Sequence, residues 1–126
     1  MKTINTTNAP KAIGPYSQGI DYNQLIFTSG QIPINPKTNK LIKKDFKAEL
    51  KQVLNNLDAI LVKGGSSLKN AIKLTVFLTD LSKFSELNEV FNLYFQDSQP
   101  ARSAVQVSAL PLGASVEIEA IARKND

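Results

Sequence analysis

Residues 99–122 read QPARSAVQVSALPLGASVEIEAIA, and this stretch near the C-terminus says most about the fold. Two segments of alternating side chains flank a turn at LPLGAS (residues 110–115), which predicts a closing hairpin of two β-strands. The same stretch holds Arg102, one of only two arginines among the fifteen Lys and Arg residues. A guanidinium presents parallel donors that match a carboxylate, so its use here indicates a specific task.

Side chains two residues apart along a strand share a face, so Arg102 and Gln106 lie on one side of the first segment. In the second segment, Glu117 and Glu119 lie opposite the valine and isoleucine side chains. If the valine and isoleucine faces of both segments pack on helices, these four polar residues lie together on the far face of the sheet. That face is then a solvated surface with an Arg–Glu pair, a subunit interface or a ligand site.

Upstream, residues 45–65 (DFKAELKQVLNNLDAILVKGG) predict a long helix. Asp45 is suited to cap its N-terminus, and Gly64-Gly65 are suited to end it. The apolar residues recur at helical spacing and form a broad stripe that needs another layer to cover it. They are Phe46, Leu50, Val53, Leu54, Leu57, Ile60 and Leu61.

The remaining segments complete the order of elements. Residues 17–31 predict two strands that turn at 21–23, and residues 32–42 predict a looser turn. Residues 71–79 alternate as a strand with Ile72, Leu74, Val76 and Leu78 on one face. Residues 80–96 predict a second helix, whose apolar face carries Phe84, Leu87, Phe91, Tyr94 and Phe95. This order favours an α+β fold with two helices on one face of a mostly antiparallel or mixed β-sheet.

Composition narrows the chemistry. With 126 residues, we expect residues 1–126 to form one domain. The absence of Cys and His excludes thiol nucleophiles, Ser-His-Asp catalysis and the usual zinc, copper and iron ligand sets. The lysines behind the net charge of +4 are scattered, which argues against a nucleic-acid partner. Neither a signal peptide nor a membrane span is apparent, and we expect a cytoplasmic protein.

Three further places carry groups suited to a ligand. Asn88 falls in line with the apolar stripe of the second helix, either as a buried amide bonded to backbone or beside a ligand. Tyr16 stands in a Pro/Gly loop, and Ser29-Gly30 end a strand where glycine permits close approach of a substrate. Each also has a purely structural explanation. Lys73 is a weaker candidate, as a Schiff-base lysine on a partly polar strand face.

Together these motifs resemble those of the reactive intermediate deaminase family, the RidA (YjgF) group. The resemblance covers nearly the whole chain, in family order. It rests on NAPKAIGPYSQG (8–19), IFTSGQIPINPKTN (26–39), VFLTDLSKFSELNEVF (76–91), PARSAV (100–105) and VEIEAIA (116–122). It implies a chorismate-mutase-like fold and a homotrimer with sites between subunits. It also implies cofactor-free hydrolysis of 2-enamino or 2-imino acids to 2-keto acids and ammonia. Pyridoxal-phosphate-dependent dehydratases release such substrates.

The resemblance assigns roles to single residues. Arg102 matches the arginine that binds the substrate carboxylate, and Glu117 matches the glutamate that orients the attacking water. Tyr16 matches a ring lining the pocket, and Ser29 and Gly30 match its wall. Alternation alone does not choose between Glu117 and the neighbouring glutamate.

Asn88 matches a helix asparagine near the cleft. Many relatives have Cys where this chain has Ala104, so thiol-dependent behaviour of the family is not expected here. Three alternatives stay open from the sequence. The first is a non-catalytic protein that binds small carboxylates, the second is an RNA-directed ribonuclease or translation inhibitor, and the third is a scaffold or chaperone.

Overall fold

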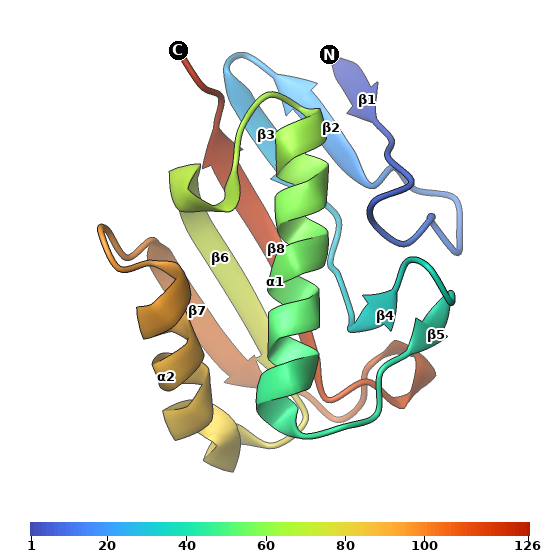
Figure 1. Ribbon diagram of the computed structural model, residues 1–126, viewed down its shortest axis with the longest axis vertical. Coiled ribbons are helices and arrows are strands. Elements are labelled where there is room, and N and C mark those ends of the chain that lie inside the picture. The colour runs from blue at the N-terminus through green and yellow to red at the C-terminus, as the bar shows by residue number, and fades with distance from the viewer.

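The computed structural model describes residues 1–126. Its main sheet has six strands in the order β1-β2-β3-β8-β6-β7 (Figure 1). The strands are β1 (Lys2–Ile4), β2 (Gly19–Tyr22), β3 (Leu25–Thr28), β6 (Ala71–Leu78), β7 (Ala101–Gln106) and β8 (Val116–Arg123). A separate two-stranded sheet pairs β4 (Ile34–Asn35) with β5 (Lys40–Leu41). The helices are α1 (Phe46–Lys63) and α2 (Phe84–Tyr94), with short 3₁₀ turns η1 (Leu68–Asn70), η2 (Leu81–Lys83) and η3 (Pro111–Gly113).

Helix α1 begins and ends where the sequence predicts. The Asp45 carboxylate accepts a hydrogen bond from the Ala48 amide at 2.8 Å, which satisfies one of the free donors of the first turn. At the other end, the Gly64 amide donates to the carbonyls of the last turn. All seven apolar residues of the predicted stripe are buried. Helical periodicity therefore identified the buried face of α1 correctly.

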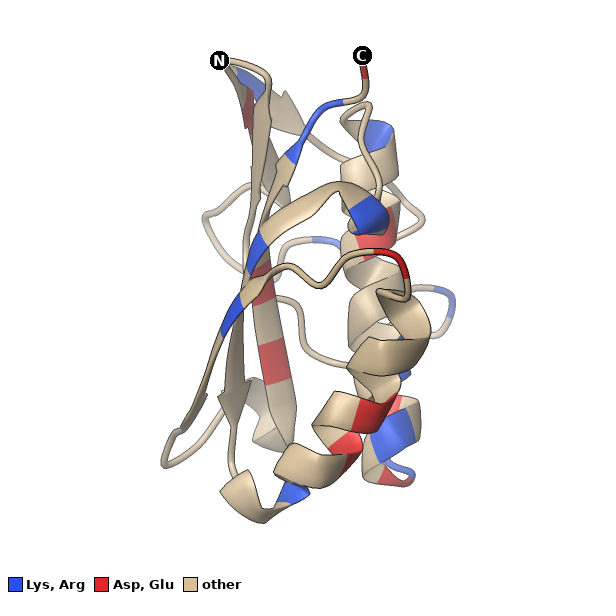
Figure 2. Ribbon diagram, turned by 90° about the vertical axis from the view of Figure 1, so that its left-hand side faces the viewer, with Lys and Arg blue, Asp and Glu red and all other residues tan.

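The core lies between the two helices and one face of the sheet. Figure 2 shows both helices on the same side of the sheet, as predicted for this α+β fold. The sheet contributes Ile4, Ile26, Leu74, Val76, Leu78, Val116, Ile118, Ala120 and Ala122 to this core. No helix is long and apolar enough to cross a membrane.

The prediction that β7 and β8 form a closing hairpin is wrong. Strands β7 and β8 do not pair with each other, because β6 lies between them (Figure 1). β7 pairs with β6 in parallel and β8 pairs with β6 antiparallel, so the sheet is mixed. Helix α2 carries the chain from β6 to β7, as a parallel pair requires a crossover. The segment around Pro111 then carries the chain past the end of β6.

Local predictions on the strands need smaller corrections. The turn between β2 and β3 lies at Asn23 and Gln24, which both have positive φ, while Asp21 is still in β2. Ile72 is exposed rather than buried, because a register shift between Ala71 and Lys73 breaks the alternation of β6 there.

Helix α2 also departs from its predicted buried face. Val90 is buried with Leu87, Phe91 and Phe95, whereas Tyr94 is only partly buried and donates its hydroxyl hydrogen to Asn55. Phe84 is 41% exposed.

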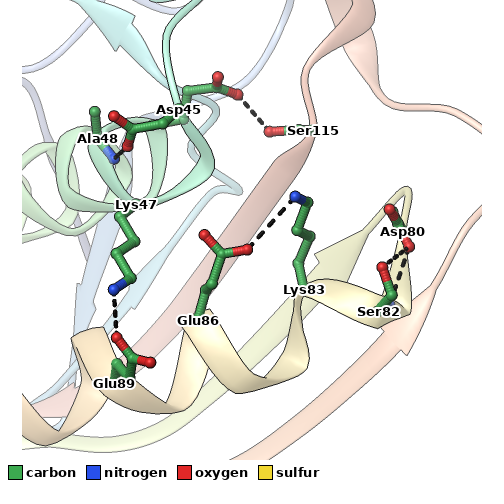
Figure 3. A network of polar contacts seen from close by, with 10 residues as sticks. Asp45, Lys47, Ala48, Asp80, Ser82, Lys83, Glu86, Glu89 and Ser115 are labelled. Atoms are coloured by element: carbon green, nitrogen blue, oxygen red, sulfur yellow. Dashed lines mark hydrogen bonds and ion pairs between the residues drawn. The ribbon is translucent and has the colours of Figure 1, made fainter.

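Polar contacts join the start of α1 to its surroundings (Figure 3). Lys47 of α1 forms an ion pair with Glu89 of α2, and the Ser115 hydroxyl donates to Glu49. Both members of the Lys47–Glu89 pair are exposed, so this pair contributes little to stability.

Candidate functional site

Arg102 lies on β7 with its side chain on the helix side of the sheet. It is opposite Leu74 in the parallel register, and Leu74 is a core residue. Its guanidinium Nη2 donates to the side-chain oxygen of Asn88 at 2.9 Å. Its Cζ atom lies 5.1 Å from the ring centroid of Phe84 and 4.9 Å from that of Phe91. One side of α2 therefore holds the guanidinium.

The Arg102 charge has no anionic partner within the chain. None of the four ion pairs includes it, and Asn88 takes its single hydrogen bond. Burial lowers the pKa of Arg102 from its usual value, but a guanidinium still stays protonated at neutral pH. Four of its five N–H donors are therefore free for an anion. Arg102 also lines an open hollow of about 410 Å³, together with Asn88, Phe91, Asn92, Gln99 and Pro100.

Glu117 lies on β8 and points to the other face of the sheet. It is opposite Phe77, whereas the neighbouring residues of β6, Val76 and Leu78, are in the core. Its carboxylate lies directly over Gly30: a Cβ added there would be only 2.7 Å from Oε2 of Glu117. A side chain at position 30 would therefore displace the Glu117 carboxylate from the place it takes over this glycine. The sequence had indicated room for a substrate instead.

The carboxyl group of Glu117 is half-buried and has no hydrogen-bond or ion-pair partner in the chain. Burial raises its pKa above the ordinary value, and the negative charge of Glu119 raises the pKa further. Glu119 itself is exposed. A carboxylate with a raised pKa is better suited to accept a proton near neutral pH than an ordinary surface glutamate.

Buried amide contacts fix the loop that carries Tyr16. Gln18 accepts from the Thr6 amide at 2.7 Å and donates to the Pro10 carbonyl at 2.8 Å. The Ser29 hydroxyl donates to the Ser17 carbonyl at 2.6 Å. Ser29 therefore ties the end of β3 to this loop, and its hydroxyl is engaged within the chain.

Tyr16, Gly30 and Glu117 line one small pocket of about 50 Å³. This volume has room for a few water molecules, whereas pockets for drug-sized ligands are about 300–1,000 Å³. Asn56 of α1 supports the pocket wall by donating to the Ile34 carbonyl at 2.9 Å. The other lining residues are Pro10, Lys11, Ile13, Gln31, Ile32, Ile34 and Pro111.

The predicted site residues therefore form two groups. Arg102 and Asn88 lie on the helix side of the sheet, and Glu117 lies on the opposite face beside Tyr16 and Gly30. The two hollows share no lining residue. The prediction that Arg102 and Glu117 lie together on one face is thus wrong within a single chain. The cause is that the side of β7 that carries Arg102 faces the helices, whereas the side that carries Val105 faces away from them.

Of the other polar residues predicted for the far face, Glu119 does lie there with Glu117, but Gln106 does not. Gln106 lies on the helix side, where its side-chain oxygen accepts from the Leu81 amide at 2.8 Å. Lys73 lies on the far face and donates to the Ser103 hydroxyl at 2.9 Å. These contacts give Gln106 on the edge strand β7 and Lys73 on the neighbouring β6 structural roles.

The sequence reasoning missed the aromatic surroundings of Arg102. Phe84 and Phe91 were assigned to a buried stripe with Asn88 in line, so the i, i+4, i+7 spacing was visible. The pairing of that stripe with the arginine was not visible, because it depends on which side of β7 faces α2. Gln18 and Asn56 gave no signal, since an isolated amide in a loop or helix is usually exposed.

Comparisons with known proteins agree with this fold. The chain matches the family described as Endoribonuclease L-PSP over residues 6–124. It is 52% identical over 123 residues to a RutC family protein of Pyrococcus horikoshii, with 98% of each chain covered. It is 48% identical over 121 residues to a mouse protein named 2-iminobutanoate/2-iminopropanoate deaminase, with 96% of this chain and 90% of the mouse chain covered.

Solved structures show the same similarity. The crystal structure of TdcF from E. coli with bound serine matches with a TM-score of 0.93 and 45% identity. The match covers 99% of this chain and 100% of TdcF. The chain belongs to the Endoribonuclease L-PSP family, the RidA (YjgF) group that its motifs indicated. The chorismate-mutase-like α+β fold is likewise confirmed.

Proposed function

We propose that this protein hydrolyses small 2-imino or 2-enamino acids to 2-keto acids and ammonia. The observation that carries the proposal is the Arg102 guanidinium, which is held in place by α2 and has no anion within the chain. Such a group is suited to a small carboxylate. Two mammalian relatives, from mouse and cattle, are named 2-iminobutanoate/2-iminopropanoate deaminases.

The proposed site needs two copies of the chain. Arg102 and Glu117 lie on opposite faces of the sheet, and the hollows that they line have no residue in common. The face that carries Glu117 is not covered by a helix (Figure 2). The strand registers place apolar side chains on it. These are Ile20, Phe27, Phe77, Val105 and Ile121. A homotrimer that packs this face against neighbouring copies would bring one chain's Arg102 to another chain's Glu117.

The chemistry follows from these two groups. Arg102 binds the substrate carboxylate through two parallel hydrogen bonds, which fixes the position of C2. A water molecule held by Glu117 attacks C2 of the C=N bond, and Glu117 takes a proton from it. Glu117 passes that proton to the imine nitrogen, which gives a neutral carbinolamine. A second proton then moves from the new hydroxyl group to the nitrogen as the C–N bond breaks, so that the 2-keto acid forms and ammonia leaves. Backbone groups near Gly30 hold the nitrogen end. A positioned base contributes about 100- to 10,000-fold in such reactions.

The proposed reaction would follow the reactions of enzymes that release imino acids. Pyridoxal-phosphate-dependent dehydratases generate them from serine or threonine, and this protein would remove them. Neither metal nor cofactor is required, since water is the only co-reactant. A carboxylate-binding protein without catalytic activity would share the Arg102 contact but would not need an adjacent glutamate.

A coupled assay tests the proposed reaction. A threonine dehydratase supplies 2-iminobutanoate, semicarbazide traps the imine, and the rate of semicarbazone formation is followed as this protein is added. We expect the rate of trapping to fall because hydrolysis competes for the imine. A trapping rate that is independent of the protein would contradict the enzymatic proposal, and saturable binding of the keto acid under those conditions would favour the non-catalytic alternative.

A further inference from the structure

Phe84 is exposed although it belongs to the apolar stripe of α2. Its side chain is 41% exposed, while Leu87 and Phe91 of the same helix are buried. Instead of entering the core, its ring lies against the guanidinium of Arg102. An exposed phenylalanine in contact with an unpaired cation calls for an explanation beyond core packing.

The contacts to Arg102 come from one line of residues along α2. Phe84, Asn88 and Phe91 follow the i, i+4, i+7 spacing of a single helix face. The guanidinium carbon is about equally far from the two rings, at 5.1 and 4.9 Å, and Asn88 accepts one hydrogen bond at 2.9 Å. Two rings and one amide therefore restrict the position of the guanidinium.

Aromatic rings hold a cation differently from a carboxylate. The attraction comes from the ring quadrupole and is worth about 0.5–2 kcal/mol for each contact. A ring face accepts no strong hydrogen bond and carries no net charge. It can therefore fix the guanidinium while leaving both the positive charge and the N–H donors available. A neighbouring Asp or Glu would fix it equally well but would compete with an anionic ligand for those donors.

We propose that Phe84 and Phe91 are positioning residues, which hold Arg102 ready to bind the carboxylate of a 2-keto or 2-imino acid. This inference rests on the proposed function, because it assumes that Arg102 is the group that binds the substrate. Asn88 acts with the two rings and sets the rotation of the guanidinium about its own axis. Neither ring needs to touch the substrate.

Phe84 is the better residue to test, because Phe91 is buried and its removal would weaken the core. Phe84→Leu keeps an apolar side chain but removes the ring, whereas Phe84→Tyr keeps the ring. Leu93→Ala is a matched control, since Leu93 is exposed on the opposite face of the same helix.

The experiment measures pyruvate binding to the full-length protein by calorimetry or NMR titration, because binding needs no turnover. We expect Phe84→Leu to weaken binding by about 2- to 30-fold, the range that corresponds to one cation–π contact. Phe84→Tyr and Leu93→Ala should bind like the wild type. In an Arg102→Lys background, Phe84→Leu should have a smaller effect, because the planar group that the ring holds is gone.

In the deaminase assay, Phe84→Leu should raise KM with little change in kcat, as expected when ground-state and transition-state binding weaken together. Equal pyruvate affinity for Phe84→Leu and the wild type would refute the positioning role. Loss of affinity in Phe84→Tyr as large as in Phe84→Leu would also refute it. If the wild type does not bind pyruvate, both the positioning role and the proposed carboxylate site at Arg102 are refuted. Ring-dependent binding without any imine hydrolysis would refute only the proposed function.

Discussion

Arg102 and Glu117 are both partly buried groups that lack an opposite charge within the chain. Partial burial without a partner disfavours the charged form of each group, and the directions of both pKa shifts reflect this. Proteins keep such groups where a ligand or a reaction uses them, at a cost in stability. At the scale of single residues, we therefore expect that removing either charged group raises the stability of the fold and lowers the activity.

Glu117→Gln should stabilise the fold at neutral pH while abolishing imine hydrolysis. The pKa of Glu117 is raised in the folded state, so its stabilising contribution is complete below the unfolded-state pKa and is lost as pH rises through the folded-state pKa. Ionised Glu117 thus costs stability at pH 7, and glutamine removes that cost. Thermal unfolding at pH 7 should give the variant the higher Tm, with the gap closing near pH 4. A lower Tm for the variant at pH 7 would show that the carboxylate is stabilised in the native protein.

The negative charge of Glu119 should affect the pH dependence of the reaction. This negative charge raises the pKa of Glu117, so Glu119→Gln should lower that pKa. Since a base must be deprotonated, kcat/KM should rise with pH through the pKa of Glu117. The acid limb of the profile should therefore move to lower pH in Glu119→Gln. An unmoved limb would mean that another group controls the reaction.

At the scale of elements, α1 is the part most fully encoded in local sequence. Its N-cap contact from Ala48 to Asp45 stabilises one end, and its apolar stripe buries one face. Asp45→Ala should lower the free energy of unfolding by about 1 kcal/mol, as loss of such a cap typically does. Urea unfolding measures this, with Asp97→Ala as the control because Asp97 is an exposed acid with no hydrogen bond in the chain. Activity at low temperature should persist; loss of activity in a folded Asp45→Ala variant would contradict a purely structural role.

How far the sequence predicted the structure differs between elements. Both helices, the ends of α1 and the α+β class followed from periodicity and capping, because these signals are local. The order of β7, β6 and β8 did not follow, since alternation is the same whichever strand lies alongside. The valines of β7 suggested that their side faces the helices. In the structure the Arg102 side does, and Phe84, Asn88 and Phe91 of α2 contact the guanidinium there.

The sequence named candidate site residues but not how they are arranged. The family resemblance selected Arg102, Glu117, Tyr16 and Gly30, and the structure brings the last three into one pocket. It also shows that the space over Gly30 is taken by the glutamate. The separation of Arg102 from Glu117 could not be predicted, because it depends on long-range strand pairing.

At the scale of the whole molecule, the sheet has a helix-covered face and an uncovered face (Figure 2). Each face carries one half of the proposed site. A chain acting alone would hold a substrate carboxylate on one side and its water on the other. The proposed reaction therefore requires copies of the chain to meet so that the two halves face each other, as in the proposed homotrimer.

Mixing two inactive variants tests this dependence most directly. Arg102→Ala and Glu117→Gln should each lack imine hydrolysis alone. Unfolded together and refolded as mixed oligomers, they should regain activity. Random mixing leaves about a quarter of the sites intact, because each of the two contributing chains is competent half the time. Recovery toward that fraction is the result that we predict, and mixtures as inactive as the separate variants would contradict a site shared between chains.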